Sequence, residues 1–354
     1  MLKRFALAVA TVTAMLFLTS CLGGSSSPAT PPGSQQNPAR TVKQQASCPP
    51  CLYVPNLGYA GVPSTVTVYP VGTTGNTAPS QYIHGSRTQL KSPEAVAVDS
   101  SRNIYVAQYG NSVTIYAAGV TGNVAPTAVI SGHKTGLDRP FGIALDPVNG
   151  DIYVANEDDS SITFYAAGSS GDVNPLGTIS GANTGLDYPL SVALDASGNI
   201  YVSNLYYPSG SGGSITVYPA GSVGNAAPTQ TIGGSDTGLN VPLQLAVDSN
   251  LNIYVANNPG SSRQEPSVAV YAAGANGNVA PTETIEGTKT KMSADGVALD
   301  ASGNIYVSDD HNRRGKEESS ITFYAAGSSG DVKPLGTLEG NKTKLLYPGG
   351  IAIR

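Results

Sequence analysis

The stretch SSITFYAAGSSGDV occurs twice in the chain, at Ser160–Val173 and again at Ser319–Val332. The two copies match at all 14 positions and begin 159 residues apart. Identity over this length indicates an internal repeat. A repeat of fixed period decides the architecture of the whole chain, so it is considered before any other signal.

Three shorter phrases recur between and around the two copies. Ile-Tyr-Val begins at residues 104, 152, 200, 253 and 305, and Leu52-Tyr53-Val54 is an earlier copy. A second tyrosine recurs at residues 69, 116, 165, 218, 271 and 324, and a proline follows each one ten residues later. The spacing of 47 to 53 residues gives six units, and the two identical stretches lie three units apart.

Each unit contains four short apolar runs. In the third unit they are Phe141–Leu145, Asp151–Ala155, Ser161–Tyr165 and Leu176–Ser180. These runs are rich in Ile, Val, Thr and Tyr and are bounded by Gly, Asn, Asp or Pro, which is typical of β-strands. No sustained helical period follows the first 20 residues. Four strands in a unit of about 50 residues predict the blade of a β-propeller.

The first run of each unit alternates small and large side chains. In Gly142-Ile143-Ala144-Leu145 one face carries Gly and Ala and the other carries Ile and Leu. Because successive side chains of a strand point to opposite faces, a small face lets the large face of a neighbouring blade approach near the axis. The two repeated tyrosine positions hold 12 of the 19 tyrosines, and we expect them to pack between blades with the hydroxyl at an edge.

The two ends of the repeated region complement each other. Pro348–Arg354 matches the first strand of a unit, with no second strand after it, while Cys51–Val54 matches a second strand that lacks its first. The sequence therefore predicts an all-β fold: a six-bladed β-propeller of four-stranded antiparallel blades, closed by pairing of the N- and C-terminal strands. An open ring would instead expose the strand edges of the incomplete blade.

Units such as Arg139–Asp146 followed by Gly150–Asn156 resemble NHL repeats. The resemblance covers Cys51–Arg354 and implies a propeller. It says little about function, because propellers of this type include binding modules, scaffolds and some enzymes.

The first 20 residues resemble a lipoprotein signal peptide. Lys3 and Arg4 precede the apolar run Phe5–Leu18, and Leu18-Thr19-Ser20-Cys21 resembles a bacterial lipobox. In proteins with this motif the signal is removed before the cysteine, which is then lipidated, so Cys21 is the predicted lipidation site. Residues 21–47 are predicted to form a disordered tether rich in Ser, Pro and Gln, and residues 48–354 are predicted to form the propeller. The expected location is a bacterial cell envelope, on the outer membrane if the host is Gram-negative, because Leu22 rather than Asp follows the cysteine.

Cys48 and Cys51 form a Cys-x-x-Cys motif. A redox site of this kind normally lies in a βαβ context, which is absent from the pattern. In an oxidising compartment a local structural disulfide is the favoured interpretation, with free or partner-linked thiols as the alternative.

Two sets of residues are expected near one mouth of the central channel. The residue after each second strand is Asn56, Gln108, Asn156, Asn204, Asn257 or Asp309, which suggests either an Asx-type turn in every blade or a ring of polar ligands.

The residue that opens the first strand is Glu94 or Asp295 in two units and apolar or Gly in the others. Glu94, Asp295, Asp309 and Asn56 resemble the metal pocket of gluconolactonase-type propeller esterases. Such oxygen ligands suit Ca²⁺, but solvated loop carboxylates are the favoured interpretation.

Long loops between second and third strands are expected on the same face. They are Leu57–Ser64, Leu205–Gly213, Asn258–Pro266 and Asp310–Glu318, and they carry the candidate binding residues Tyr59, Tyr206, Tyr207, Arg263, His311, Arg313 and Arg314. Tyr beside Arg suits a glycan or protein partner.

Composition narrows the functional classes. The net charge is −5 with 12% charged residues, so there is no basic surface for nucleic acid. No catalytic elbow, zinc pair or phosphate loop occurs in the sequence. The sequence favours a lipid-anchored binding or scaffold module that requires no cofactor. The alternative is a Ca²⁺-type hydrolase, lactonase or lyase with its site at the channel mouth, where a lyase would use His311 and Glu94.

Overall fold

A computed structural model describes residues 50–58, 61–206, 212–259, 264–313 and 316–354, with the backbone alone for the strand residues among 311–318. The propeller belongs to the unit Gln45–Arg354. Within the described residues the only helix is the 3₁₀ turn η1, Ser86–Thr88. None of the described segments forms a helix that is long and apolar enough to cross a membrane.

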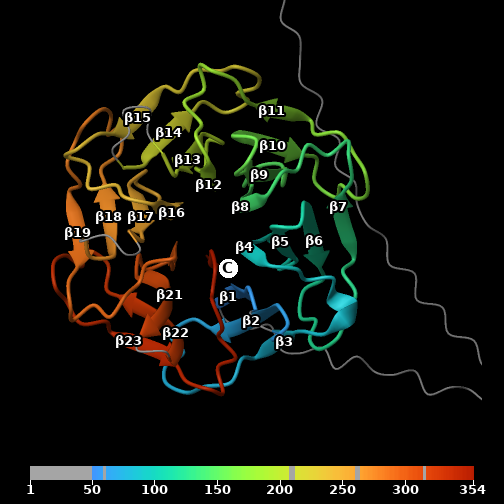
Figure 1. The fold of residues 1–354 in the computed structure, drawn as a ribbon, viewed down its shortest axis with the longest axis vertical. Coiled ribbons are helices and arrows are strands. Elements are labelled where there is room, and N and C mark those ends of the chain that lie inside the picture. The colour runs from blue at the N-terminus through green and yellow to red at the C-terminus, as the bar shows by residue number, and fades with distance from the viewer. Residues whose placement is uncertain (1–49, 59–60, 207–211, 260–263, 314–315) are drawn as a thin grey trace, which may run out of the picture. The chain divides into compact units, whose positions relative to one another are not determined.

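The strands form six sheets of four strands each, arranged as a ring around one axis (Figure 1). Blade one is β24 (Ala352–Ile353), β1 (Cys51–Asn56), β2 (Thr65–Pro70) and β3 (Gln81–Ile83). Blade two is β4 (Pro93–Val98), β5 (Ile104–Gln108), β6 (Ser112–Tyr116) and β7 (Ala128–Ser131). Blade three is β8 (Pro140–Leu145), β9 (Ile152–Asn156), β10 (Ser161–Tyr165) and β11 (Gly177–Ile179).

The other three blades repeat this order. Blade four is β12 (Pro189–Leu194), β13 (Ile200–Asn204), β14 (Ser214–Tyr218) and β15 (Gln230–Gly233). Blade five is β16 (Pro242–Val247), β17 (Ile253–Asn257), β18 (Ser267–Tyr271) and β19 (Glu283–Glu286). Blade six is β20 (Gly296–Leu299), β21 (Ile305–Arg313), β22 (Lys316–Tyr324) and β23 (Gly336–Glu339). The prediction of a six-bladed propeller of antiparallel four-stranded blades is confirmed.

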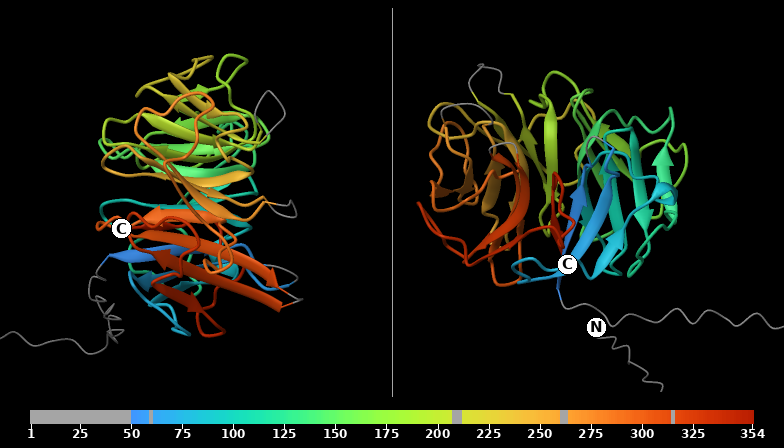
Figure 2. Two further views of the ribbon diagram at one scale, coloured as in Figure 1. Left: turned by 90° about the vertical axis from the view of Figure 1, so that its left-hand side faces the viewer. Right: turned by 60° about the horizontal axis from the view of Figure 1, so that its bottom comes forward.

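One predicted loop is wrong. The sequence predicts a long loop at Asp310–Glu318, but β21 and β22 continue through most of it as a paired hairpin, with Asp310 opposite Ser319 and Arg313 opposite Lys316. The strand pattern continues because antiparallel pairing satisfies the backbone groups that a loop would leave to water. Figure 2 shows the propeller, with this hairpin, from two further sides.

The repeated tyrosines of the third strands are buried more deeply than expected. Tyr69, Tyr116, Tyr165, Tyr218, Tyr271 and Tyr324 are all at most 1% exposed. Each hydroxyl donates to a threonine carbonyl in the segment that leads into its own blade, for example Tyr165 to Thr135 at 2.7 Å and Tyr324 to Thr290 at 2.6 Å. The hydroxyl therefore does not lie at an edge, because a buried phenol needs an internal partner.

The small residues of the inner strands permit close approach between blades. A Cβ atom added at Gly142 in blade three would lie 2.6 Å from the Cα atom of Ser191 in blade four. A Cβ atom at Gly349 would overlap the carbonyl oxygen of Glu94. Near the axis, glycine is thus required by contact with the neighbouring backbone.

The C-terminal strand closes the ring. β24 pairs antiparallel with β1, with Leu52 opposite Ile353, and Cys51 and Arg354 exchange hydrogen bonds of 2.7 and 3.0 Å. The same segment also bonds to blade two, through Gly350 N–H to Glu94 O at 2.7 Å. Ile351 is 1% exposed. The predicted pairing of the two terminal strands is confirmed.

Deletion of Gly349–Arg354 is expected to give insoluble or protease-sensitive protein. The deletion removes the hydrogen bonds of the closing strand, worth about 1 kcal/mol each, and the buried side chain of Ile351, worth about 1.5–3 kcal/mol. Their sum is a large part of the net stability of about 5–15 kcal/mol typical of a domain. Limited proteolysis of the soluble fraction measures the effect, and a soluble, resistant truncation would contradict this account of closure.

Candidate functional site

The segments that lead into the first strands form one end of the channel, here called the mouth face. In every blade one residue of this segment has left-handed backbone geometry, with φ between 48° and 57°: Ser92, Arg139, Tyr188, Val241, Ala294 and Tyr347. None of the six is glycine, although this geometry is unfavourable for L-residues, and least favourable for β-branched Val241. Neighbouring groups hold the geometry: Arg139 N–H donates to Asn111, and Arg139 O accepts from Glu157 N–H. The same strained backbone thus presents side chains of five different types in the six blades, with tyrosine in two of them.

A β-bulge follows this position in the first strand of blades two to five. In blade two the register shifts between Pro93 and Ala95, so Glu94 is the extra residue. The register shifts likewise in blades three, four and five, at the steps that contain Phe141, Leu190 and Leu243. Bulges turn a side chain away from the regular pleat. They aim these residues toward the channel.

Blade six lacks this bulge. Gly296 pairs with Ser308 and Val297 with Val307 without a shift, and Asp295 N–H donates to Ser308 O at 2.9 Å. Val297 follows Thr290 by seven residues, whereas the equivalent Val96 of blade two follows Thr88 by eight, so blade six is one residue shorter here. Asp295 consequently reaches the channel from a regular backbone, unlike Glu94.

A cavity of about 200 Å³ opens at the mouth of the channel. Its polar lining includes Glu94, Asp295 and Asp310, and its apolar lining includes Leu57, Phe141, Leu243, Tyr347 and Pro348. A smaller cavity of about 20 Å³ lies next to it on the axis, and Glu94 and Asp295 line both. The structure therefore brings together two of the four residues predicted as metal ligands.

Glu94 is buried at this mouth. Its side chain is 7% exposed, and within the described residues its carboxyl group makes no hydrogen bond or ion pair. Desolvation by burial raises the pKa of Glu94 to about 7, and Glu157 raises it further while Arg139 lowers it. Near neutral pH, Glu94 thus exists as a mixture of acid and carboxylate.

Asp295, in contrast, is held by several donors. Its Oδ1 accepts from Asn258 Nδ2 at 2.8 Å, and its Oδ2 accepts from Ser293 Oγ at 2.8 Å and from Asp310 N–H at 2.7 Å. Donors of this kind stabilise the carboxylate form of an acid. Asp295 thus has three donors that favour its carboxylate form, whereas Glu94 has none within the described residues.

Asn56 and Asp309 do not line the mouth cavity. Asn56, Gln108, Asn156, Asn204, Asn257 and Asp309 are at most 1% exposed and form part of the second strands. In blades one to five the side-chain oxygen accepts from a backbone N–H of the incoming segment, at 2.5–3.4 Å. In blade three, Asn156 Oδ1 accepts from Asp138 N–H while Asn156 Nδ2 donates to Thr163 Oγ1 at 3.1 Å. The predicted Asx-type turn is thus wrong, because the amide joins segments 17 or more residues apart.

Asp309 fills the amide position of blade six with a carboxyl group. Its Oδ1 accepts from the backbone N–H groups of Ser293 and Ala294 at 2.8 and 3.2 Å, and its Oδ2 accepts from Thr322 Oγ1 at 2.8 Å. Complete burial raises the pKa of Asp309 to about 7 despite these bonds, and Asp295 adds to the rise. A site that accommodates a neutral amide in five blades thus holds an acid in the sixth.

Gln244 links the inner strands of neighbouring blades beside the small cavity, a role that the sequence analysis missed. From β16 of blade five, Gln244 Oε1 accepts from Val297 N–H and Ile351 N–H, both at 2.9 Å, and its Nε2 donates to Ile351 O at 2.9 Å. A Cβ atom at Gly296 would lie 2.7 Å from Gln244 Oε1, so glycine makes room for it. The signal was present in the sequence, because Gln replaces Gly, Ala or Ser at this position of the inner strand.

Arg139 anchors a charged cluster beside Glu94. Its guanidinium lies 3.2 Å from Glu157 and 2.5 Å from Asp158, and its Cζ atom lies 4.3 Å from the centre of the Tyr109 ring. The predicted binding residue Tyr206 is 53% exposed and contacts Tyr188 edge to face, with ring centres 5.4 Å apart. These groups give the mouth face exposed aromatic surface.

Several predicted residues cannot be placed. Cys21, Cys48, Tyr59, Tyr207, Arg263 and Arg314 lie outside the described residues, and only the backbone of His311 and Arg313 is described. Cys51 is buried and disulfide-bonded. Among the described residues no group of three or more His, Cys, Asp and Glu side chains is arranged to hold a metal ion.

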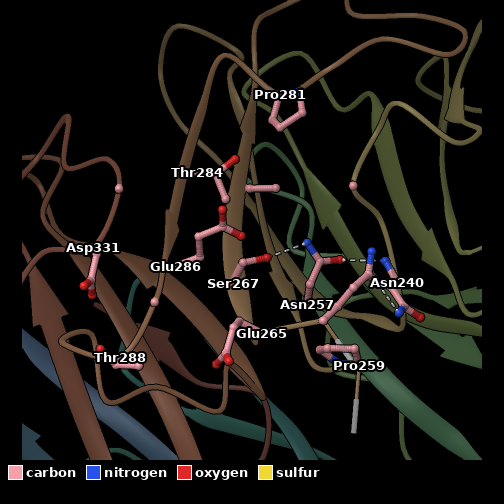
Figure 3. Close-up of a pocket in the computed structure, with 15 residues that line it drawn as sticks. Asn240, Asn257, Pro259, Glu265, Ser267, Pro281, Thr284, Glu286, Thr288 and Asp331 are labelled. Atoms are coloured by element: carbon pink, nitrogen blue, oxygen red, sulfur yellow. Dashed lines mark hydrogen bonds between the residues drawn. The ribbon is translucent and has the colours of Figure 1, made fainter. Parts of the chain in front are cut away.

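A second cavity, of about 760 Å³, lies in blade five (Figure 3). Its lining includes Asn240, Asn257, Ser267, Ala269 and Glu286. Ala269 stands where the other five blades have threonine, so Asn257 Nδ2 donates instead to Ser267 Oγ at 3.5 Å. The bond from Asn240 N–H to Asn257 is also long, at 3.4 Å. A missing threonine side chain thus opens this cleft and weakens the contact beside it.

No family model and no curated protein matches the sequence. A protein of unknown function from Bacteroides caccae is similar in structure, with 12% identity, a TM-score of 0.60, and coverage of 86% of this chain and 98% of that chain. A chain of a nidogen/laminin complex has 13% identity, a TM-score of 0.53 and the same coverage. Hydrazine synthase from Kuenenia stuttgartiensis has 14% identity and a TM-score of 0.49, and the match covers 68% of this chain and 65%, less than two thirds, of that chain. At these identities the first two likenesses show the propeller fold alone.

Replacement of Asp309 by Asn is expected to stabilise the propeller, and the gain should grow with pH. Asp309 has a folded-state pKa of about 7 against an ordinary value of 3.8, so below pH 3.8 both states carry the proton and the gain is absent. Between these values the unfolded chain loses the proton first, and stability falls as pH rises. The neutral amide of the variant avoids this loss, and the gain above pH 7 is expected to reach about 2–4 kcal/mol. Urea denaturation at several pH values measures it.

Blade three provides the matched control. Asn156→Asp places a carboxyl group in the equivalent amide position, so it should destabilise the protein with the opposite pH dependence. A pH-independent effect in both variants would show that the carboxyl group at this position is not the cause.

Proposed function

We propose that this chain is a lipid-anchored protein of a bacterial cell envelope whose propeller acts as a non-catalytic binding or scaffold module for a protein or glycan partner. The proposed anchor is a lipidated Cys21 after a signal peptide of residues 1–20, with residues 21–47 as the tether. The lipobox-like stretch Leu18–Cys21 supports the anchor, and Leu22 supports the outer membrane in a Gram-negative host. The repeats of Cys51–Arg354 are proposed to be of the NHL type.

The observation that carries the binding role is the mouth face. A rigid, repeated backbone presents side chains of five different types from the six blades there, around a cavity of about 200 Å³. Variable residues on a rigid scaffold are the usual arrangement of a binding surface.

A metal-dependent hydrolase, lactonase or lyase is the second candidate, because Glu94 and Asp295 line the same cavity. Two observations favour the binding role over it. Both oxygen atoms of Asp295 already accept hydrogen bonds, and Asn56 and Asp309 are engaged within their blades. A Ca²⁺ ion needs six to eight oxygen ligands.

Truncation of mouth aromatics is expected to abolish partner capture. The double variant Phe141→Ala, Tyr188→Ala is immobilised and exposed to envelope extract and to a glycan panel. It should lose the ligands that the unmodified protein retains, because large aromatic side chains dominate binding surfaces. The control is Ala269→Thr, which changes the lining of the blade-five cleft and leaves the mouth unchanged. Equal capture by all three proteins would place binding elsewhere and refute the proposed mouth.

The metal alternative is tested by calcium titration of the melting temperature. If the binding role is correct, Ca²⁺ should leave the melting temperature unchanged in the unmodified protein, in Glu94→Gln and in Asp295→Asn, because bound ligands stabilise the folded state by mass action. A saturable rise that both variants lose would instead establish a metal site at the mouth.

A further inference from the structure

We propose that the mouth cavity binds an alkylammonium group, with the ammonium at Glu94 and Asp295 and its hydrocarbon chain against Phe141 and Leu243. This inference rests on the proposed binding function and names the chemistry of the ligand. A lysine side chain of a partner protein and a free alkylamine share that chemistry, and the experiment separates them.

The first argument is the carboxyl group of Glu94. The residue Glu94 is 7% exposed and lines both axial cavities, and its carboxyl group has no hydrogen-bond or ion-pair partner within the described residues. A buried polar group without a partner costs free energy, and an ionised one costs more. Burial accordingly raises its pKa to about 7. A cation in the cavity would supply the missing partner and favour the ionised form.

The second argument is the division of the mouth into two halves. Glu94 and Asp295 come from blades two and six, on either side of closure blade one. Phe141, Leu190 and Leu243 come from blades three, four and five, on the opposite side of the axis. An acidic half facing an apolar half matches a ligand with a charged end and a hydrocarbon chain.

The space for the ligand lies over blade one. Gly349 occupies the inner position there, and its lack of a side chain is fixed by the carbonyl of Glu94, which a Cβ atom would overlap. The cavity lies against Gly349, Gly350 and Pro348. Its volume of about 200 Å³ admits a chain of a few carbon atoms rather than a folded segment.

The surrounding charges favour a cation. The described titratable groups nearest the mouth are Glu94, Asp295, Asp310 and the cluster of Arg139 with Glu157 and Asp158. Arg139 is already paired with two carboxylates, at 3.2 and 2.5 Å. The field at Glu94 is therefore dominated by acids, which repels anions and attracts cations.

An ammonium suits this geometry better than a divalent metal ion. It carries three N–H donors, which two carboxylates and one further acceptor satisfy. The oxygen atoms of Asp295 already accept three hydrogen bonds, so they can share in a hydrogen-bonded contact but offer little to a close metal shell. The aromatic side chains of Phe141 and Tyr347 also line the cavity, and aromatic faces attract cations.

The test is calorimetric binding of n-butylammonium to the full chain, above the Glu94 pKa of about 7. We expect saturable binding that is at least tenfold weaker in Glu94→Gln and unchanged in Glu339→Gln, a matched substitution on the outer strand β23. Butan-1-ol, the neutral analogue, should bind at least tenfold more weakly than n-butylammonium. Thermal melting of both variants verifies that they are folded.

A second arm compares n-butylammonium with the capped peptide acetyl-Gly-Lys-Gly-amide. Tighter binding of the peptide assigns the site to a lysine of a partner protein, tighter binding of the amine assigns it to free alkylamines, and either supports the proposal. Absence of amine binding, equal affinity for butan-1-ol, or unchanged affinity in folded Glu94→Gln overturns it. In those cases the unmodified protein could still capture an envelope ligand that the Phe141 and Tyr188 double variant fails to capture. That result would support the proposed binding function without the ammonium site.

Discussion

A buried polar side chain at the end of each second strand, an amide in five blades and Asp309 in the sixth, makes the contact on which both the ring and its mouth depend. In blade three, Asn156 accepts from Asp138 of the incoming segment and donates to Thr163 of the third strand. This fixes the segment just before the left-handed residue and the bulge. The direction in which Glu94, Phe141 or Leu243 points is thus set by a group that itself faces away from the channel. The polar side chains that were expected to surround the mouth therefore have a structural role, because they position the residues that line it.

Closure of the ring depends on more than one strand pair. β24 contributes only Ala352–Ile353 to the regular ladder with β1. Gln244 adds bonds from blade five to Val297 of blade six and to Ile351, so it joins three consecutive blades through one side chain. An amide with two kinds of polar atom suits this role, since it satisfies an N–H and a C=O of the same strand. The closing blade is thereby held from both neighbours, because Gly350 also bonds to Glu94 O in blade two.

The repeat made the fold predictable, because the same pattern of strand positions occurs in six copies. The observed β8, Pro140–Leu145, differs by one residue from the predicted run Phe141–Leu145. The sequence also placed Glu94 and Asp295 in the blades beside the closure, and both line the mouth cavity. Prediction from the sequence failed where the result depends on the direction in which a side chain points rather than on its position in the repeat. Whether Asn56 points into the channel or into its blade is decided by bonds to Leu346, which lies 290 residues away.

Departures from the repeat carry the information about function, but only some of them alter the mouth. Ala269, in place of the threonine of the other blades, lies in the cleft of blade five. Asp309 places an acid where the other blades have an amide. Glu94 differs from both, because a bulge residue has no fixed partner in the ladder and its side chain can change without disturbing a strand pair. The inner position of the bulge is therefore where a propeller can alter its chemistry at the lowest cost in stability. The bulges here hold Glu94 in blade two, beside the closure, and Phe141, Leu190 and Leu243 in the next three blades, so the sides of the ring differ chemically although its backbone repeats.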